Sequence, residues 1–553
     1  MSNDQQKPAP ESGQTEPSYF DPARRAAEQG MAGPAVNPVG AEDPNLSASG
    51  VAQPTPAFPP GQMAAPPQPI PQTNSRGGVS SREIWNLTWP QILMMLFQFM
   101  VGFTNVWVAG RIDALVQASF GLVIQVFFLF LVIGIAIANA STATMSQALG
   151  AGRPLRATRY LGLACNLGLA FCVVTVFLGF IFRHEIMWLI QVPENIVDLS
   201  VRMWLFFLFG VPAQYAISLG ASAFRAYKKV TMPLYTGMVI CVLNFFLNIG
   251  LGLGRWGFPD VNLAGLGFPD INLGYQSAHN LGPDGLAIGA LISMYAGAVF
   301  IFIMLLRHGY LKRAAFAPLR WQKKAVGYLV KVALPAGGNQ LSWQLGYLVL
   351  LGIVGALPMG SVHALAGMTA GMRIESLLFL PAIAFGMTGT ILVGYCLGNG
   401  NPVEARRVGL KILIIGCLSM TLVALLIWPF VREVSAFMAP SLDVQPEVVS
   451  YLLFNLLATP FTVGSTILGG LLTGAGASIY PFIIYGAVTW LLRLPLAWLL
   501  GHVVLNSASG IYASQAISQV VMCCIILLVF FRCDWARFSM YSAKPHQPPK
   551  AAG

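Results

Sequence analysis

The sequence predicts an all-α membrane protein with twelve transmembrane helices in two parallel six-helix lobes. First, 56% of its 553 residues are apolar and only 10% are charged, whereas soluble proteins contain about 25% charged residues. Second, twelve apolar stretches after Ser80 are long enough to cross a bilayer, which takes roughly 20 residues each. Third, landmarks of the first half recur in the second.

The amino-terminal segment differs in composition from the rest of the chain. Residues 1–79 contain 15 prolines, few aromatic residues and no apolar run of the kind that follows the start of a signal peptide. Such a segment buries too little apolar surface to offset its ordering entropy. We therefore predict a disordered, proline-rich cytoplasmic tail.

The twelve predicted spans are helices rather than barrel strands, because their apolar runs are continuous instead of alternating. Their approximate centres are Phe97, Phe130, Phe171, Phe207, Val242, Tyr295, Tyr347, Leu380, Leu418, Leu457, Ile484 and Val521. The eight cysteines lie in or beside these runs without metal-ligand spacing, so we expect neither disulfides nor a metal site.

The distribution of basic residues predicts the orientation. With the amino terminus inside, the inner segments contain 22 Lys and Arg residues and the outer segments five. This bias places both termini of a multi-pass membrane protein in the cytoplasm. The net charge of +11 is scattered along the chain, so we expect no nucleic-acid partner.

A loop sequence occurs twice at an offset of 248 residues. "LGAGRPLRATR" at 149–159 is echoed by "LGNGNPVEARR" at 397–407, and the prolines at 212 and 233 recur at 460 and 481. The prolines that open spans 1 and 7 lie 245 residues apart. Two six-helix halves follow, related by an axis along the membrane normal, as in transporters that rock two bundles about a central cavity. We expect the repeated loop to have a structural role rather than to contact substrate.

This repeat sets the predicted domain boundaries. They are 1–79 for the tail, 80–310 for the N-lobe, 311–325 for a basic cytoplasmic linker, 326–533 for the C-lobe and 534–553 for a cytoplasmic carboxy-terminal tail. The longest outer loop, about 255–283, contains the tandem duplication "GFPDVNLAGL" and "GFPDINLGYQ". It is interpreted as a solvated loop, with a lid over the outer opening as the alternative.

Five stretches, in order, resemble the multidrug and toxic compound extrusion (MATE) family of bacterial type. They are "SQALGAGRPLRATR", "RAYKKVTMPLYTGMVICVLN", "GLAIGALIS", "MRIESLLFLPAIAFG" and "GYCLGNGNPVEARR". The resemblance covers about residues 80–533. It implies twelve helices in two lobes around a V-shaped cavity, location in the bacterial inner membrane, and export of organic compounds driven by H⁺ or Na⁺.

The resemblance also exposes substitutions at positions where bacterial members often have carboxylates. Asn105 stands at the span 1 position, and span 5 has Asn244 followed by Asn248. Ala290 occupies the place of a hydroxyl residue in span 6. An amide can contribute an oxygen to Na⁺ but cannot carry a proton, so proton coupling through the N-lobe is not expected.

Further polar residues lie in the second half. Spans 7 and 10, which have carboxylates in another branch of the family, have none here, but span 7 contains Gln340 and Gln344. These glutamines and the three asparagines are our candidates for binding substrate or ion. For the asparagines, simple hydrogen bonding between helices is the equally weighted alternative.

Three ionisable residues lie deep within predicted spans: Arg373 and Glu375 in span 8 and Arg493 in span 11. A charge near the bilayer centre costs roughly 2.5–3.5 kcal/mol and needs a partner or water. Arg373 and Glu375 point about 200° apart on a helix, so Arg493 is the better partner for Glu375. Either the two form a permanent ion pair, or Glu375 couples transport by taking up a proton or a substrate cation; snorkelling to the interface is the third interpretation.

We therefore expect an ion-coupled (H⁺ or Na⁺) secondary antiporter that exports amphipathic, often cationic, organic compounds by alternating access. The alternatives are a flippase for lipid-linked precursors and a narrow-specificity metabolite exporter. An enzyme is not expected, because HExxH and Walker A motifs are absent from the sequence, and a channel would need a repeated pore motif. Small organic substrates and lipid are the expected partners, the coupling ion replaces a cofactor, and the chain is expected to be a monomer.

Overall fold

The computed structural model describes residues 79–256, 275–276, 281–312, 315–358, 360–438 and 441–541. All of them belong to the compact unit Gln72–Gly553. The predicted tail, apart from Val79, and most of the duplicated loop at 255–283 lie outside the described residues.

The first half contains six long helices. They are α1 (Ser81–Ile112), α2 (Ala114–Gly150), α3 (Pro154–Ile181), α5 (Val197–Ala226), α6 (Thr231–Leu247) with its π-helical continuation η2 (Asn248–Gly252), and α7 (Gly282–Arg307). The short helices α4 (Arg183–Leu189) and η1 (Glu194–Ile196) lie between α3 and α5. After η2, the two-residue strands β1 (Arg255–Trp256) and β2 (Tyr275–Gln276) pair antiparallel, with Arg255 opposite Gln276.

The second half repeats this order. It consists of α8 (Leu319–Gly355), α9 (Ser361–Gly398), α10 (Pro402–Ile427), η5 (Trp428–Phe430), α11 (Val431–Met438), α12 (Gln445–Gly474), α13 (Ile479–Ala487), η6 (Val488–Arg493), α14 (Leu494–Trp498), η7 (Leu499–Val504), α15 (Ala508–Arg532) and η8 (Trp535–Phe538). The span after α12 is thus interrupted by two π-helical segments, η6 and η7. Short helices follow α3 and α10 alike.

Every predicted span centre falls inside one of these helices. In the described part of the chain, eleven helical stretches are long and apolar enough to cross a membrane. The predicted span missing from these eleven is the seventh, α8, which has 37 residues; Asn339, Gln340 and Gln344 lower its hydropathy. The predicted all-α, two-lobe fold is confirmed.

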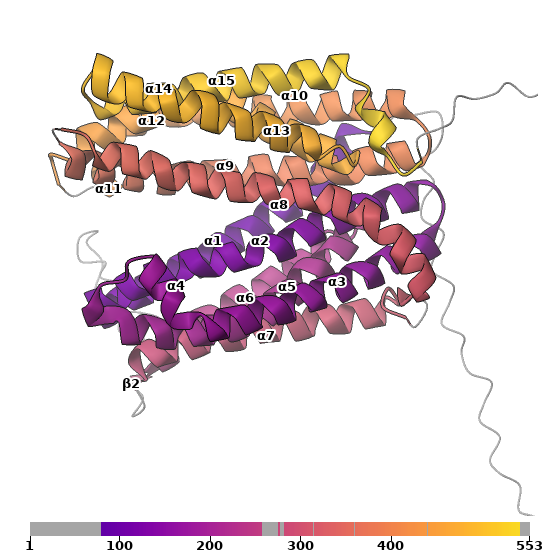
Figure 1. The fold of residues 1–553 in the computed structure, drawn as a ribbon, viewed down its shortest axis with the longest axis horizontal. Helices are drawn as coiled ribbons and strands as arrows, with labels where there is room; N and C mark the ends of the chain where they lie inside the picture. The colour runs from indigo at the N-terminus through magenta and orange to yellow at the C-terminus, as the bar shows by residue number, and fades with distance from the viewer. Residues whose placement is uncertain are drawn as a thin grey trace, which may run out of the picture. The chain divides into compact units, whose positions relative to one another are not determined.

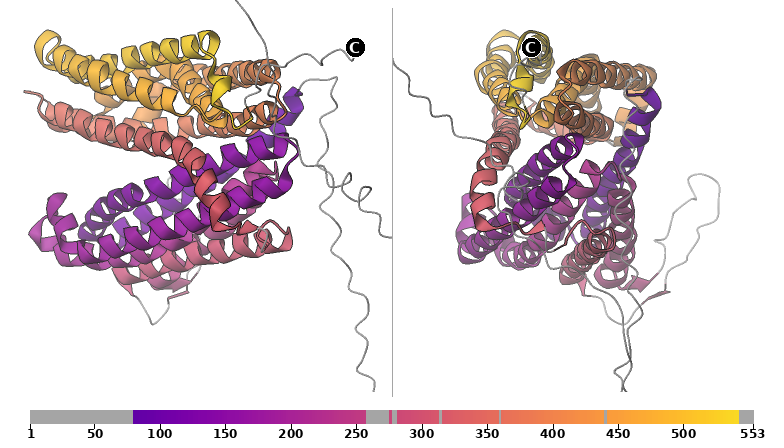
Figure 2. Two further views of the ribbon diagram at one scale, coloured as in Figure 1. Left: turned by 45° about the vertical axis from the view of Figure 1, so that its right-hand side comes forward. Right: turned by 90° about the vertical axis from the view of Figure 1, so that its right-hand side faces the viewer.

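The packing follows the sequence repeat. In the first half α2 packs on α3 and α5, and α5 packs on α7; in the second, α9 packs on α10 and α12, and α12 packs on α15. Figure 1 shows α1–α7 gathered on one side and α9–α15 on the other. The halves meet reciprocally, because α1 packs on α9 and α8 packs on α2. In Figure 2 the ribbon of α8, which contains Pro335, is bent, as expected where proline removes a backbone hydrogen bond.

Large apolar side chains cover the outside of the helices. Leu418, Leu425 and Leu457 are 70%, 62% and 63% exposed. A soluble protein would bury so many apolar residues, but lipid solvates them at no cost. The surface therefore matches a bilayer environment.

The repeated loop forms the same turn in both halves. Gly152 and Gly400 follow α2 and α9 with φ values of 67° and 73°, a left-handed conformation that glycine adopts without strain. Arg153 N–H donates to Ala148 O, and the equivalent Asn401 N–H donates to Cys396 O, which is the Schellman pattern of helix ends. The next helix starts with a proline in each case. The predicted structural role of the loop thus has a local basis. We call this end of the bundle, where α2, α5, α9 and α12 finish, the basic end.

Candidate functional site

The N-lobe candidates gather in one buried cluster. Asn105 of α1, Asn244 of α6 and Asn248 of η2 are 3%, 0% and 0% exposed. Asn248 Nδ2 donates to Asn105 Oδ1 at 2.6 Å, and Asn244 Nδ2 donates to Ser293 Oγ of α7 at 3.4 Å. Among the described residues, Oδ1 of Asn244 and Oδ1 of Asn248 have no hydrogen-bond partner. The cluster therefore presents two buried amide oxygens that can accept.

The local backbone explains how this cluster forms. The helix widens to π geometry at Asn248, a change that often occurs at functional sites. Gly289 of α7 faces Asn248, and a Cβ there would collide with Asn248 Oδ1. The hydroxyl that is missing at Ala290 is supplied by Ser293, three residues later. Sequence reasoning missed Ser293, although this serine is the last residue of the "GLAIGALIS" stretch.

In the C-lobe, Glu375 and Arg493 have separate partners. Glu375 of α9 is half-buried, and its carboxylate accepts a hydrogen bond from Tyr451 OH of α12. Arg493 of η6 is 2% exposed, and its Nε donates to Ser518 Oγ of α15 at 2.8 Å. Neither of the two ion pairs found among the described residues joins Glu375 to Arg493. The predicted direct ion pair is therefore wrong for this structure.

Other polar side chains lie between the Glu375–Tyr451 and Arg493–Ser518 hydrogen bonds. Gln515 Nε2 of α15 donates to Tyr347 OH of α8 at 3.1 Å and to Asn455 Oδ1 of α12 at 3.2 Å. Ser518, the partner of the arginine, donates back to Gln515 O at 2.7 Å. Asn455 follows Tyr451 by one helical turn, so both face the same side of α12. The C-lobe thus contains a polar cluster contributed by α8, α9, α12, η6 and α15.

A small cavity lies beside Glu375. It has a volume of about 30 Å³, and its polar lining comes from Glu375, Asn455, Thr459 and Thr462. The two threonine hydroxyls donate to carbonyls four residues earlier in α12, at 3.0 and 3.2 Å. Their oxygens keep lone pairs for a cation. A space of this volume holds one or two water molecules, so the cavity suits a single ion rather than an organic molecule.

The remaining candidates stay outside this cluster. Arg373 is exposed on α9, and Gln340 is half-buried on α8. Gln344 Nε2 donates to Gln125 Oε1 of α2 at 3.2 Å and so connects the lobes. Sequence reasoning missed Tyr451, because a tyrosine in an apolar helix shows no pattern that distinguishes a carboxylate partner from a packing residue.

Comparisons with known proteins match this architecture. One family model, MatE, matches twice, at residues 90–249 and 335–499, so each half is one copy and more than half of the chain is covered. The Thermotoga maritima relative, "Probable multidrug resistance protein NorM", is 22% identical over 82% of this chain and 93% of its own. "Multidrug resistance protein MdtK" of Yersinia enterocolitica is 25% identical over 76% of this chain and 88% of its own.

Solved structures show the same fold. The Vibrio cholerae MATE transporter VcmN in its bent form superposes with a TM-score of 0.70 at 18% identity, over 81% of this chain and 95% of that one. A MOP superfamily transporter from Pyrococcus furiosus gives a TM-score of 0.72 at 17% identity, over 83% and 96%. With the doubled MatE match and the membrane-crossing helices, this establishes the identity: the chain belongs to the MATE family of membrane transporters.

Proposed function

We propose that this transporter is an ion-coupled secondary antiporter of the bacterial inner membrane that exports amphipathic, often cationic, organic compounds by alternating access. The observation behind the proposal is the position of Glu375. Every other acidic residue in the described part of the chain lies in a loop, in a short helix or in the first turn of a long helix. Glu375 alone lies in the interior of a membrane-crossing helix.

The surroundings of Glu375 suit reversible cation binding. A carboxylate within the membrane is costly unless it has a partner. Tyr451 occupies one carboxylate oxygen, and the other polar side chains that line the cavity, those of Asn455, Thr459 and Thr462, are uncharged. Because neither ion pair found among the described residues includes Glu375, its charge is available to H⁺ or Na⁺. The cavity is too small for an organic substrate, so the substrate binds elsewhere.

The N-lobe amides also support a coupling site at Glu375 in the C-lobe. Asn105, Asn244 and Asn248 cannot release a proton, although the unpartnered oxygens of the last two could contribute to Na⁺ coordination. We therefore place proton-dependent coupling, if the ion is H⁺, in the C-lobe. The relatives are named as multidrug resistance proteins, which supports a broad range of organic substrates. We propose a monomer in the bilayer, with both termini cytoplasmic and no cofactor besides the ion.

Transport by purified protein in proteoliposomes tests this proposal. Efflux of a fluorescent organic cation is measured under a pH gradient, a Na⁺ gradient, or neither, for the wild type, Glu375→Gln and Glu447→Gln. Glu447 is the matched control, because its carboxylate also accepts from a tyrosine hydroxyl, Tyr512 at 3.4 Å, but lies in the first turn of α12. We expect Glu375→Gln to lose the gradient dependence and Glu447→Gln to keep it. Normal gradient-driven transport by Glu375→Gln would refute the role of Glu375, and no transport by the wild type would refute a broad organic-cation specificity.

A further inference from the structure

The two lobes are joined at the basic end by contacts that obey the sequence repeat. Gln147 Nε2 of α2 donates to Gly474 O at the end of α12, at 2.8 Å. Tyr395 OH of α9 donates to Ala226 O at the end of α5, at 2.9 Å. Adding 248 to 147 and 226 gives 395 and 474, so the two bonds are equivalent under the repeat. Each lobe reaches across to the last carbonyl of the other lobe's fourth span.

The glycines of the repeated loop make a second reciprocal contact. A Cβ at Gly150 would collide with the carbonyl of Tyr395, and a Cβ at Gly398 would collide with the carbonyl of Gln147. The ends of α2 and α9 therefore touch backbone to backbone. Larger residues at either glycine would separate the lobes here.

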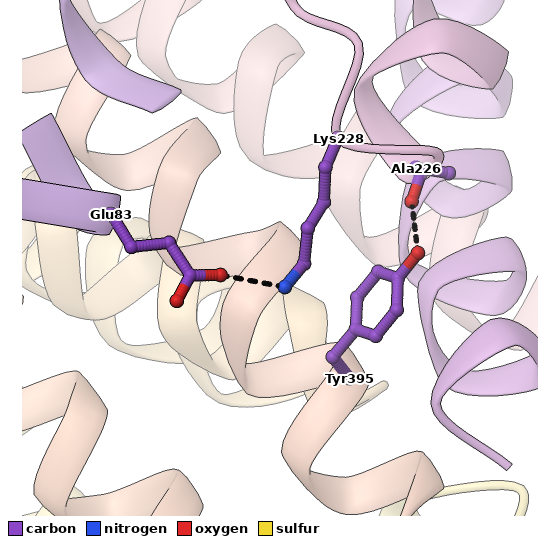
Figure 3. A network of polar contacts seen from close by, with 4 residues as sticks. All are labelled: Glu83, Ala226, Lys228 and Tyr395. Carbon is purple, nitrogen blue, oxygen red and sulfur yellow. Dashed lines mark hydrogen bonds and ion pairs between the residues drawn. The ribbon is translucent and has the colours of Figure 1, made fainter. Parts of the chain in front are cut away.

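One half of this junction is charged. Lys228 follows α5 with a φ of 59°, and its counterpart after α12 is Gly476 with a φ of 81°. Both positions form the same Schellman turn. Lysine is thus held in a backbone conformation that favours glycine, which points to a role for its side chain. Figure 3 shows that role: Lys228 Nζ pairs with Glu83 Oε1 at 2.8 Å and lies 4.6 Å from the ring centre of Tyr395.

The other half is uncharged and fully enclosed. Gln147 is 0% exposed. Its Oε1 accepts from Tyr328 OH at 3.2 Å and from Met540 N–H at 2.9 Å, in addition to the bond that its Nε2 donates. By contrast, the side chains of Lys228 and Glu83 are 21% and 31% exposed and line an open cleft of about 450 Å³. Water can replace the partly exposed contact of Lys228 with Tyr395 cheaply, but not three buried hydrogen bonds.

We propose that Lys228, positioned by Glu83 of the same lobe, and Tyr395 of the C-lobe form the releasable half of a latch between the lobes, while the junction at Gln147 acts as the hinge. The inference rests on the proposed alternating-access function, which requires the basic end to open. Opening begins where Lys228 leaves Tyr395, and both lobes then pivot about Gln147.

The native thiol of Cys396 reports on this opening. Cys396 is partly exposed and directly follows Tyr395, whose ring centre lies 4.6 Å from Lys228 Nζ. Its modification by a membrane-impermeant maleimide, quantified by peptide mass spectrometry on the full-length protein in liposomes, measures access at the latch. Cys172 of α3, which is 5% exposed, reports global unfolding in the same sample. The assay needs neither substrate nor gradient, so it can fail while the transport experiment succeeds, and the reverse.

Three single variants and one double variant decide the question. Lys228→Gly relaxes the backbone but removes the contact with Tyr395, and we expect Cys396 labelling to accelerate about two- to fivefold, the effect of one partly exposed cation–π contact. Glu83→Gln should act in the same direction and add little to Lys228→Gly in the double variant. Lys229→Ala, which removes the same charge one residue away, should change the rate less than twofold. If Cys172 is labelled in Lys228→Gly, that variant is unfolded, and the labelling of Cys396 in Glu83→Gln then decides whether the latch exists.

Two outcomes would overturn the latch. One is wild-type labelling of Cys396 in Lys228→Gly and Glu83→Gln, which would make Lys228 a local turn residue only. The other is equal acceleration by Lys229→Ala, which would attribute the effect to net charge. If Lys228 served only the turn, Lys228→Gly would leave the lobes closed, because glycine adopts that backbone conformation with less strain.

Discussion

Replacing Gln147 with leucine tests how strongly the lobes are joined at the basic end. Gln147 makes three hydrogen bonds while fully buried. In Gln147→Leu, Gly474 O loses its cross-lobe donor, and this carbonyl at the end of α12 has no intrahelical partner. Met540 N–H loses its acceptor, whereas Tyr328 OH keeps Phe538 O at 2.9 Å.

The size of the effect follows from these two orphaned groups. Each unsatisfied buried group costs about 1–3 kcal/mol, with Met540 at the lower end because it is only half-buried. We therefore expect the free energy of unfolding to fall by about 2–4 kcal/mol. Equilibrium unfolding in mixed micelles with increasing SDS, followed by far-UV circular dichroism, measures it.

Gln344→Leu is the matched control for this substitution. Gln344 also bridges the lobes, but it is half-buried and makes one hydrogen bond, to Gln125 at 3.2 Å. We expect it to cost less than about 1 kcal/mol. A Gln147→Leu variant no less stable than Gln344→Leu would refute the reasoning.

Two further predictions concern the same unfolding measurement. Gly150→Ala should destabilise the protein by about 1–3 kcal/mol, because its new Cβ meets the backbone of α9. Gly121→Ala, with open space around it in α2, should stabilise the protein by about 0.5–1 kcal/mol. Changes of equal sign in the two variants would contradict this prediction. Burial raises the pKa of Tyr310, whose ring stacks on Tyr227 at 3.9 Å, to about 12 from its ordinary value of 10. The folded protein keeps this phenol protonated, so the stability that it contributes is intact below pH 10 and is lost between pH 10 and 12, by roughly 3 kcal/mol. Tyr310→Phe should flatten that decline, and an unchanged pH profile would show that Tyr310 does not cause it.

Hydropathy and the repeat predicted the fold because both depend on local chemistry. A bilayer demands about 20 apolar residues per span whatever the neighbouring helix is, and a Gly–Pro turn needs the same residues wherever it occurs. α8 shows the limit: it is a full-length helix, yet its polar residues keep it below the hydropathy of a typical span.

The candidate site was predicted only in part. Glu375 stood out as a lone acidic residue in an apolar helix, but its partner was not Arg493. Sequence spacing gives neighbours along one helix, whereas partners on other helices depend on how each helix is rotated. Arg493 ends the π-helical η6, and each extra residue in a turn rotates the following side chains by about 100°. That rotation is not visible in the hydrophobic pattern.

By itself, the sequence determined the membrane-spanning helices, their repetition and the turn that ends α2 and α9, since these follow from local backbone preferences and solvation by lipid. Tertiary structure alone decided which repeated residues form hydrogen bonds between the lobes. The offset of 248 relates Gln147 to Tyr395 and Ala226 to Gly474, but the hydrogen bonds run from each lobe to the other. Such contacts depend on how two separately folded bundles dock, which no short-range pattern in the chain encodes.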